Sequence, residues 1–368
     1  MKTTDSTLYS VHAACAQVKP ADAAAMKTAA SFIDTLAMPP GSMGKLQQIA
    51  VQLAGITGSI KNCVEKKRII VVCADNGVVA EGIASAPQQV TAAQAVNMTK
   101  GRTGMSAIAA GFGDEVQVVD VGICTPYTCG AVIKRRVRNG SGNIFREPAM
   151  TRAEAEQCLL TGITLAEQAK NNGVQLLGTG EMGIGNTTTS AAVLSVLTDT
   201  DPAEITGRGG GITDVMLSHK KQVVAHAVLV NAPDKRDAVD VMAKVGGLDI
   251  ATMCGIFIGA AIYHIPVVID GYISIVAALC AVRLAPDVKD YLFASHRSAE
   301  PGYTVAARSL GVDPFLNLDM RLGEGSGCPL AFRIIEAACA MVNGMATFDG
   351  AGIDDSYLCE VRDAMGGR

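Results

Sequence analysis

Residues 68–77 decide the fold, and they read Arg68-Ile69-Ile70-Val71-Val72-Cys73-Ala74-Asp75-Asn76-Gly77. An unbroken apolar run that stops at a polar turn is typical of a strand buried on both faces of a parallel sheet. Similar strand patterns occur at residues 115–122, 173–177, 265–269 and 290–294, with helical patterns between them, such as residues 92–110 and 152–171. This alternation predicts an α/β fold with a doubly wound, mostly parallel sheet.

Two glutamates lie inside glycine-rich segments, Gly178-Thr179-Gly180-Glu181-Met182-Gly183-Ile184-Gly185 and Arg321-Leu322-Gly323-Glu324-Gly325-Ser326-Gly327. Both segments are interpreted as tight turns, and a carboxylate in a desolvated turn is a candidate general base. The alternative is a solvated glutamate in a flexible loop. Because ligands bind outside the carboxyl ends of parallel strands, we expect the polar residues that follow the strands to converge on one cleft. These residues are Asp75, Glu181, Asp270, Ser295, Ser298 and Glu324.

Composition excludes several classes of function. A net charge of −4 gives no footprint for nucleic acid, and the basic run at residues 134–138 is interpreted as a solvated surface loop. Eleven scattered cysteines without C-x-x-C spacing, and no signal-like N-terminus, favour reduced thiols in the cytoplasm. The five histidines are far apart, so no metal site is expected. Residues 251–269 lack Asp, Glu, Lys and Arg, but their glycines and Pro266 favour a buried helix, a turn and a strand over a membrane span.

Glycine-rich motifs limit the choice of ligand. Gly207-Arg208-Gly209-Gly210-Gly211 lacks the G-x-G-x-x-G pattern of dinucleotide-binding folds, and no Walker A sequence occurs. The segment Gly183-x-Gly185-Asn186-Thr187-Thr188 precedes a helical pattern at 191–197 and can offer backbone amides and hydroxyls to a single phosphate. A helix N-cap is the alternative role for these hydroxyls.

Seven segments occur in a fixed order over most of the chain. They are Pro40-Gly41-Ser42-Met43-Gly44-Lys45-Leu46, Ala74-Asp75-Asn76-Gly77-Val78, Val90-Thr91, the turn from Gly178 to Thr188, Asp270-Gly271, Ser295-His296-Arg297-Ser298-Ala299-Glu300, and Arg321 to Gly327. With these segments the chain resembles the nicotinate-nucleotide:dimethylbenzimidazole phosphoribosyltransferase family. The resemblance implies a Rossmann-like sheet in a large catalytic domain (residues 64–329) and a small helical domain formed by residues 1–63 and 330–368. It also implies a dimer in the cytoplasm.

The resemblance further implies a reaction in which nicotinate mononucleotide and an aromatic base give an α-riboside 5′-phosphate and nicotinate, without a metal or cofactor. Glu324 matches the family's catalytic base, and Glu181 matches its second carboxylate, which stabilises positive charge on the ribosyl ring. The implied substrate-binding positions are Ala86, Gln94, Gly183, Gly210, Lys220, Ser298, Leu322 and Gly323, of which Gly183, Gly210, Lys220 and Ser298 hold the phosphate. On sequence alone, Lys220 is also consistent with an ordinary surface lysine.

The chain departs from the family pattern at the pocket for the acceptor. Ala86 stands where the family usually has a serine, which makes the pocket more apolar, although Gln94 is retained. Some relatives use phenol or p-cresol as acceptor and work as heterodimers of two homologous chains. Two alternatives therefore stay open: a phenolic acceptor, and a role as mainly the structural partner of a homologous subunit. Retention of Glu181, Lys220 and Glu324 argues against the second.

Overall fold

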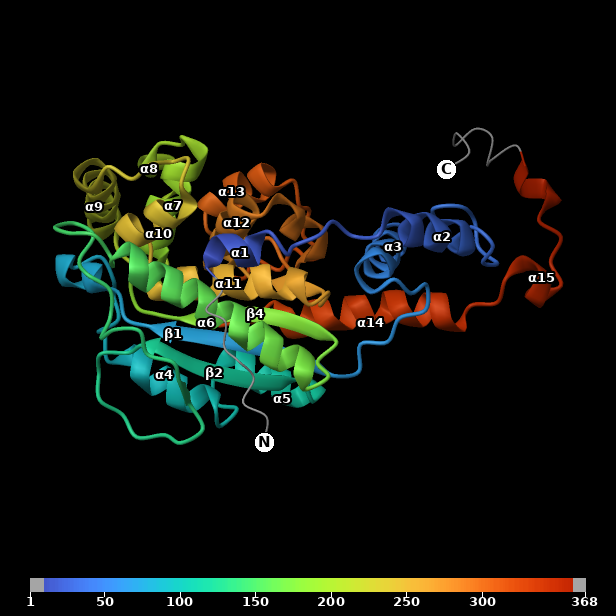
Figure 1. The fold of residues 1–368 in the computed structure, drawn as a ribbon, viewed down its shortest axis with the longest axis horizontal. Coiled ribbons are helices and arrows are strands. Elements are labelled where there is room, and N and C mark those ends of the chain that lie inside the picture. The colour runs from blue at the N-terminus through green and yellow to red at the C-terminus, as the bar shows by residue number, and fades with distance from the viewer. Residues whose placement is uncertain (1–9, 360–368) are drawn as a thin grey trace. The chain divides into compact units, whose positions relative to one another are not determined.

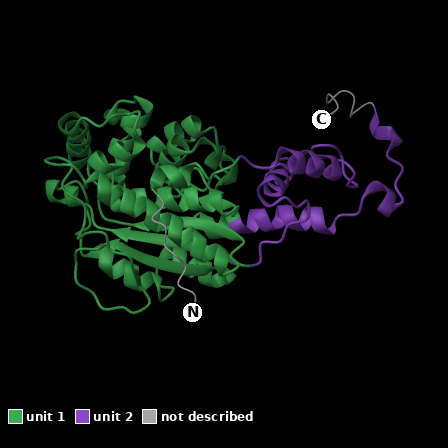
Figure 2. Ribbon diagram, viewed as in Figure 1, with its two compact units in different colours: residues 1–19, 66–331 green, residues 20–65, 332–368 purple. Residues whose placement is uncertain are grey.

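The computed structural model describes residues 10–359, and the chain divides into two compact units (Figure 2). The large unit holds the residues up to 19 together with 66–331, and the small unit holds 20–65 with the residues from 332 onward. Residues 11–15 differ from the predicted division, because they form helix α1 (Val11–Cys15), which packs on α6 (Arg152–Asn171) and α11 (Leu248–Ile262) of the large unit. Val11 and Ala14 are the buried residues of this helix.

The large unit is built on a six-stranded, all-parallel sheet, which confirms the predicted fold class. Its strands lie in the order β3-β2-β1-β4-β5-β6, so the chain adds strands on one side of β1 and then crosses to the other side. This crossing puts a topological switch point between β1 and β4, where open α/β sheets bind their ligands. The strands are β1 (Lys67–Ala74), β2 (Glu115–Gly122), β3 (Ile133–Lys134), β4 (Leu176–Met182), β5 (Val267–Ile269) and β6 (Leu292–Ala294).

Helices cover both faces of the sheet. Helices α4 (Val90–Met98) and α5 (Gly104–Phe112) pack on one face, and α11 (Leu248–Ile262) and α12 (Tyr272–Leu284) pack on the other (Figure 1). The remaining helices of the large unit are α6 (Arg152–Asn171), α7 (Asn186–Thr198), α8 (Pro202–Ile205), α9 (Asp214–Asn231), α10 (Ala238–Val245), α13 (Gly302–Leu310) and the 3-10 turns Gly77–Glu81 and Pro286–Tyr291.

The small unit is helical where the structure describes it. It contains α2 (Ala23–Ile33), α3 (Lys45–Thr57), α15 (Phe348–Ala351), the 3-10 turn Ser356–Leu358 and most of α14 (Cys328–Gly344), which begins in the last residues of the large unit. Gly55 of α3 lies against α2, because a Cβ at this position would lie 2.6 Å from Cγ of Met26. This close approach joins the two N-terminal helices of the unit.

The stretch without charged residues at 251–269 lies mostly in the core of the large unit, where it forms most of α11 and strand β5. Helix α11 crosses α6 so closely that a Cβ on Gly255 would lie 2.0 Å from the carbonyl oxygen of Leu159, and one on Gly162 would lie 2.1 Å from that of Thr252. Glycine is required at such crossings because only it lets the two backbones meet. In the part of the chain that the structure describes, no helix is both long enough and apolar enough to span a bilayer.

Two predicted elements have different bounds in the structure. Residues 92–110 form two helices, because Thr103 starts α5 with a capping box that it shares with Ser106. The strand predicted at 173–177 is β4, which continues to Met182, so Glu181 belongs to a strand and the turn begins after it. Gly180 lies inside this strand because the Glu324 turn packs directly on it, and a Cβ there would lie 2.4 Å from the carbonyl oxygen of Glu324.

The basic run at 134–138 is only partly a free surface loop. Lys134 belongs to edge strand β3, and Arg136 donates Nη2 to the buried carboxylate of Asp120 at 2.8 Å. Tyr127 donates its hydroxyl to the same carboxylate oxygen at 2.8 Å. The run therefore closes the end of β2 instead of forming a surface for an anionic polymer.

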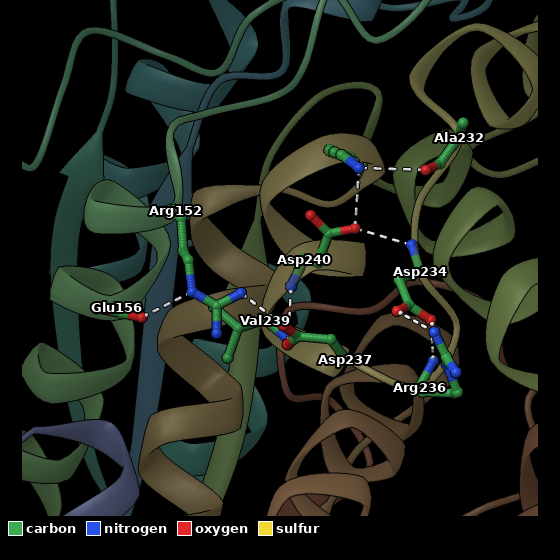
Figure 3. A network of polar contacts seen from close by, with 9 residues as sticks. Arg152, Glu156, Ala232, Asp234, Arg236, Asp237, Val239 and Asp240 are labelled. Carbon is green, nitrogen blue, oxygen red and sulfur yellow. Dashed lines mark hydrogen bonds and ion pairs between the residues drawn. The ribbon is translucent and has the colours of Figure 1, made fainter.

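A network of polar contacts joins α6 to the start of α10 (Figure 3). Asp237 is the N-cap of α10 and accepts the backbone N–H groups of Val239 at 3.0 Å and Asp240 at 3.2 Å. Arg152 of α6 donates Nη1 to Asp237 at 2.6 Å, and Asp240 accepts the N–H of Asp234 at 2.8 Å. These contacts fix the α9–α10 connection against the first turn of α6.

Candidate active site

A cavity of about 230 Å³ lies at the switch point, beyond the carboxyl ends of β1 and β4. All ten residues to which the family resemblance gave a role line this cavity, although their individual roles stay predictions. They are Ala86, Gln94, Glu181, Gly183, Gly210, Lys220, Ser298, Leu322, Gly323 and Glu324. The lining comes wholly from residues 83–324 and hence from the large unit.

Glu324 is held in a left-handed turn. Its φ is 64°, between Gly323 at 81° and Gly325 at 92°, a conformation that residues with a side chain rarely adopt. Glu324 is 5% exposed, and its Oε2 accepts the backbone N–H of Met105, in the first turn of α5, at 3.2 Å. The break between α4 and α5 supplies this helix N-terminus, whose positive end stabilises the carboxylate. Glu324 is therefore a buried, fixed group and not a solvated loop residue.

Glu181 lies at the end of β4, and its carboxylate contacts the Glu324 turn. Oε1 accepts the backbone N–H of Glu324 at 3.2 Å, and Oε2 accepts the side-chain amide of Asn186. Glu181 is 6% exposed, and burial raises its pKa to about 8, a rise that the Asn186 hydrogen bond opposes. The free protein therefore favours the protonated form of Glu181 at neutral pH.

Three of the residues expected to converge on the cleft lie behind its wall. The Asp270 carboxylate accepts the N–H groups of Gly325 at 3.0 Å and Gly327 at 2.7 Å, and Ser295 donates its hydroxyl to the Asp270 carbonyl at 2.8 Å. Asp75 accepts the N–H of Cys124 at 2.7 Å. None of the three lines the cavity, so the prediction that they face the ligand is wrong. Asp270 instead fixes the turn that carries Glu324.

One buried acid in this region had no signal in the sequence. Asp249, near the start of α11, is fully buried and accepts the amide of Asn186 at 3.1 Å, so one amide bridges the carboxylates of Asp249 and Glu181. Burial raises the pKa of Asp249 to about 6. Because residue 249 lies in an apolar helical stretch far from 181 in sequence, only the fold reveals this pairing.

Another part of the lining suits an anion. Lys220 is 1% exposed and donates Nζ to the Thr187 hydroxyl at 2.7 Å, so the alternative of an ordinary surface lysine is wrong. Burial lowers the pKa of Lys220 to about 8. Gly185, not a hydroxyl residue, is the N-cap of α7, which leaves the helix N-terminus without a side-chain cap. A buried ammonium group beside a helix N-terminus fits a phosphate.

The segment that precedes α4 gives the cavity an apolar wall. Ile83, Ala84, Ala86 and Val90 line it together with Ser85 and Gln94. The side-chain oxygen of Gln94, Oε1, accepts a hydrogen bond from the side-chain amide of Asn97 at 3.1 Å. Leu322, which also lines the cavity, packs on the start of α5. A Cβ at Gly104 would lie 2.6 Å from Cδ2 of Leu322. This wall can take a flat, mostly apolar ring.

The further lining residues with a charged or aromatic side chain, which sequence reasoning missed, are Arg208, Tyr272, His296, Glu300 and Arg321. Three of them lie in segments that carried the family resemblance, but no role was assigned to them. Arg208 lies in the glycine run at 207–211, of which the family resemblance assigns a role to Gly210 alone. In the described part of the chain, no group of three or more His, Cys, Asp and Glu side chains is placed to hold a metal ion.

Comparison with known proteins agrees with this geometry. A family model described as phosphoribosyltransferase matches residues 18–353. The chain belongs to this phosphoribosyltransferase family. The nicotinate-nucleotide–dimethylbenzimidazole phosphoribosyltransferase of Clostridium perfringens is 51% identical over 331 residues, which cover 90% of this chain and 92% of that protein.

Relatives from other bacteria are similar over the same length. The enzyme of the same name from Escherichia coli O127:H6 is 48% identical over 334 residues, covering 90% of this chain and 93% of that protein. The crystal structure of the enzyme of that name from Thermus thermophilus has a TM-score of 0.86 and 37% identity, and covers 91% of this chain and 100% of that chain. The phosphoribosyltransferase fold therefore extends over nearly the whole chain.

The contact between Gly180 and the Glu324 turn gives a first prediction. We expect Gly180→Ala to displace the turn, because the new Cβ would lie 2.4 Å from the Glu324 carbonyl oxygen and 3.0 Å from the Gly325 nitrogen. Phosphoribosyl transfer should fall more than about tenfold, since small misplacements of catalytic groups are costly. Gly111→Ala on α5, where a Cβ meets no atom within 4 Å, is the matched control and should keep full turnover. Equal turnover of both variants would contradict the close packing.

The buried acids give a second prediction. In the folded chain, burial raises the pKa of Glu181 to about 8 and of Asp270 to about 7, above the ordinary values of 4.5 and 3.8. Folding therefore favours their protonated forms, so the free energy of unfolding falls as the pH rises towards 8. Measured by denaturant unfolding, the free energy of unfolding should fall between pH 6.5 and pH 8. In Glu181→Gln this fall should be smaller by on the order of 1 kcal/mol. A pH dependence unchanged by Glu181→Gln would show that Glu181 is ionised in the free protein.

Proposed function

We propose that the chain transfers ribose 5-phosphate from nicotinate mononucleotide to an aromatic base of the dimethylbenzimidazole type. The products are nicotinate and an α-riboside 5′-phosphate. The riboside phosphate serves the assembly of the nucleotide loop of cobamides. The observation that carries the proposal is that one cavity is lined by two adjacent buried carboxylates, Glu181 and Glu324, and by the buried ammonium group of Lys220. The names of the relatives at 48–51% identity support the same substrates.

The chemistry needs few catalytic groups. The nicotinate nitrogen is cationic in the donor, so it can leave as neutral pyridine nitrogen without a general acid. What remains is to place the acceptor below C1′ and to remove its proton as the new bond forms. Attack from the face opposite the leaving group inverts C1′ and gives the α anomer. We assign the removal of the acceptor's proton to Glu324, whose carboxylate is fixed by a hydrogen bond from the Met105 backbone N–H.

Glu181 has the second role. Positive charge moves from the pyridinium ring to the ribosyl ring as the bond to nicotinate breaks, and a nearby carboxylate stabilises such oxocarbenium-like states. The pKa of about 8 in the free protein means that Glu181 must release a proton to act as an anion. The cationic donor favours this release, because a positive charge next to a carboxyl lowers its pKa.

The phosphate of the donor would bind among Gly183, Gly210, Lys220 and Ser298, which line the cavity. The acceptor would lie against Ala86 and Gln94, with Leu322 and Gly323 beside Glu324. These are assignments by family position. Every lining residue that the structure describes belongs to the large unit.

A phenolic acceptor is a second candidate, favoured by the absence of a hydroxyl at Ala86 and by its apolar neighbours in the lining. In this version Glu324 takes the proton of the phenolic oxygen. We also propose that the chain works in the cytoplasm, either as a homodimer or as a heterodimer with a homologous chain.

The test is a comparison of acceptors with the purified chain alone. Nicotinate release from nicotinate mononucleotide should depend on dimethylbenzimidazole, and substitution of p-cresol measures the phenolic candidate. No product with p-cresol removes that candidate. No product with either acceptor, together with activity after addition of a homologous chain, would show that this chain acts only as a structural partner.

A further inference from the structure

Glu300 is a buried acid in the cavity wall that the proposed reaction leaves without a role. It is 6% exposed, and Oε1 accepts the backbone N–H of Gly209 at 2.8 Å. Its other oxygen, Oε2, has no hydrogen-bond partner among the described residues and is fully buried. A buried carboxylate with one satisfied oxygen is costly to the fold, so its position calls for a functional account.

The loop at residues 207–211 is shaped around this carboxylate. A Cβ on Gly207 would lie 2.0 Å from Oε2 of Glu300, so only glycine lets the backbone pass there. Gly209 has a φ of 54°, and a Cβ on it would lie 2.8 Å from the Thr187 hydroxyl and 3.5 Å from Nζ of Lys220. Glu300 thus holds the part of the loop that lies on the Lys220–Thr187 pair.

A second group holds the same loop residue from its other side. Arg321 donates Nη1 to the carbonyl oxygen of Gly209 at 3.3 Å, while Glu300 accepts its N–H. Arg321 precedes Glu324 by three residues in the turn segment. The loop that borders the ammonium group is therefore clamped by a carboxylate and a guanidinium group, and the second clamp comes from the segment that carries Glu324.

We propose that Glu300 is a positioning residue that fixes the 207–211 loop against Lys220, and that the fixed loop makes the site select a 5′-phosphorylated donor over the same nucleoside without phosphate. This inference rests on the proposed function for its substrate. Glu300 does not itself bind the phosphate, because two anions in contact repel each other. It acts through the loop backbone, because it holds the N–H of Gly209 and so sets where Gly210, which lines the cavity, lies relative to the ammonium group.

The test compares two donors, nicotinate mononucleotide and nicotinate riboside, in the same variants. Glu300→Ala should lower kcat/KM for the mononucleotide by roughly 10–100-fold, the size of a lost charge-assisted hydrogen bond, and change that for the riboside less than about threefold. Glu300→Gln keeps an acceptor for the Gly209 amide and should restore most of the preference. Glu204→Ala, at an exposed acid three residues before Gly207, is the matched control and should leave both donors unchanged.

Equal losses for the two donors would overturn the proposal, since they would show that Glu300 only supports the fold. If Glu300→Ala does not fold, Gly207→Ala takes its place, because its Cβ displaces the loop from Glu300, and the same selective loss is expected. Binding of inorganic phosphate by calorimetry is an independent measurement. If the unaltered chain transfers nothing, the proposed function fails, and the Glu300 inference is decided by whether phosphate affinity falls in Glu300→Ala and not in Glu204→Ala.

Discussion

Glu324→Gln lowers kcat by on the order of 10²–10⁴-fold, the usual contribution of a general base, and leaves the KM for nicotinate mononucleotide within a few fold. The reason is that glutamine keeps the shape of the side chain and an oxygen for the Met105 N–H, but cannot take a proton from the acceptor. The substitution also keeps the left-handed turn, because residues 323 and 325 remain glycine. Initial-rate kinetics with both substrates varied measure the effect.

The control for this substitution is Glu167→Gln, at an exposed position of α6 outside the cavity lining, which should be neutral. Turnover within a few fold of the unaltered chain would remove Glu324 from the base role. The neighbouring Glu181, which accepts a hydrogen bond from the Glu324 backbone N–H, would then be the first carboxylate to test in that role.

Lys220→Met raises the KM for nicotinate mononucleotide by roughly 10–100-fold, because the phosphate loses a charge-assisted hydrogen bond. The same change should not destabilise the free protein. Burial lowers the pKa of Lys220 to about 8, which shows that the fold disfavours its charge, and methionine fills a similar volume without one. Kinetics and thermal unfolding of the same preparation test both parts together.

The matched control is Lys221→Met, at the next residue of α9, which does not line the cavity. We expect it to leave the KM unchanged. Lys220→Met could instead lower the melting temperature and leave the KM unchanged. That result would mean that Lys220 supports the fold through Thr187 and has no part in holding the phosphate.

The alternation of strands and helices could be predicted from the sequence, because buried strands are apolar runs that end at polar residues. Residues 68–74 form the central strand β1, and the helical pattern at 152–171 matches α6. The strand containing Glu181 was harder, since Gly178 and Gly180 resemble a turn in the sequence. They are in the strand because the Glu324 turn packs on Gly180, and this contact joins residues far apart in the chain.

The family resemblance indicates the residues that line the cavity. It does not indicate the buried groups that hold those residues in place. Nothing in the sequence distinguishes Lys220 from the adjacent Lys221, and only the fold buries Lys220 beside Thr187. Asp249, Glu300 and Asp270 act on the site through backbone or amide partners, which leave no spacing pattern. Local patterns therefore indicate elements and strand ends, while the partners of a buried charge depend on long-range packing.

The most direct test of the central claim is to follow one reaction of the purified chain by NMR, with nicotinate mononucleotide and dimethylbenzimidazole as substrates. We predict equimolar nicotinate and a riboside 5′-phosphate with the α configuration at C1′, formed at least about a hundredfold more slowly by Glu324→Gln. A β-configured product, or release of free ribose 5-phosphate in place of a riboside, would contradict inverting transfer at the Glu324 and Glu181 cavity.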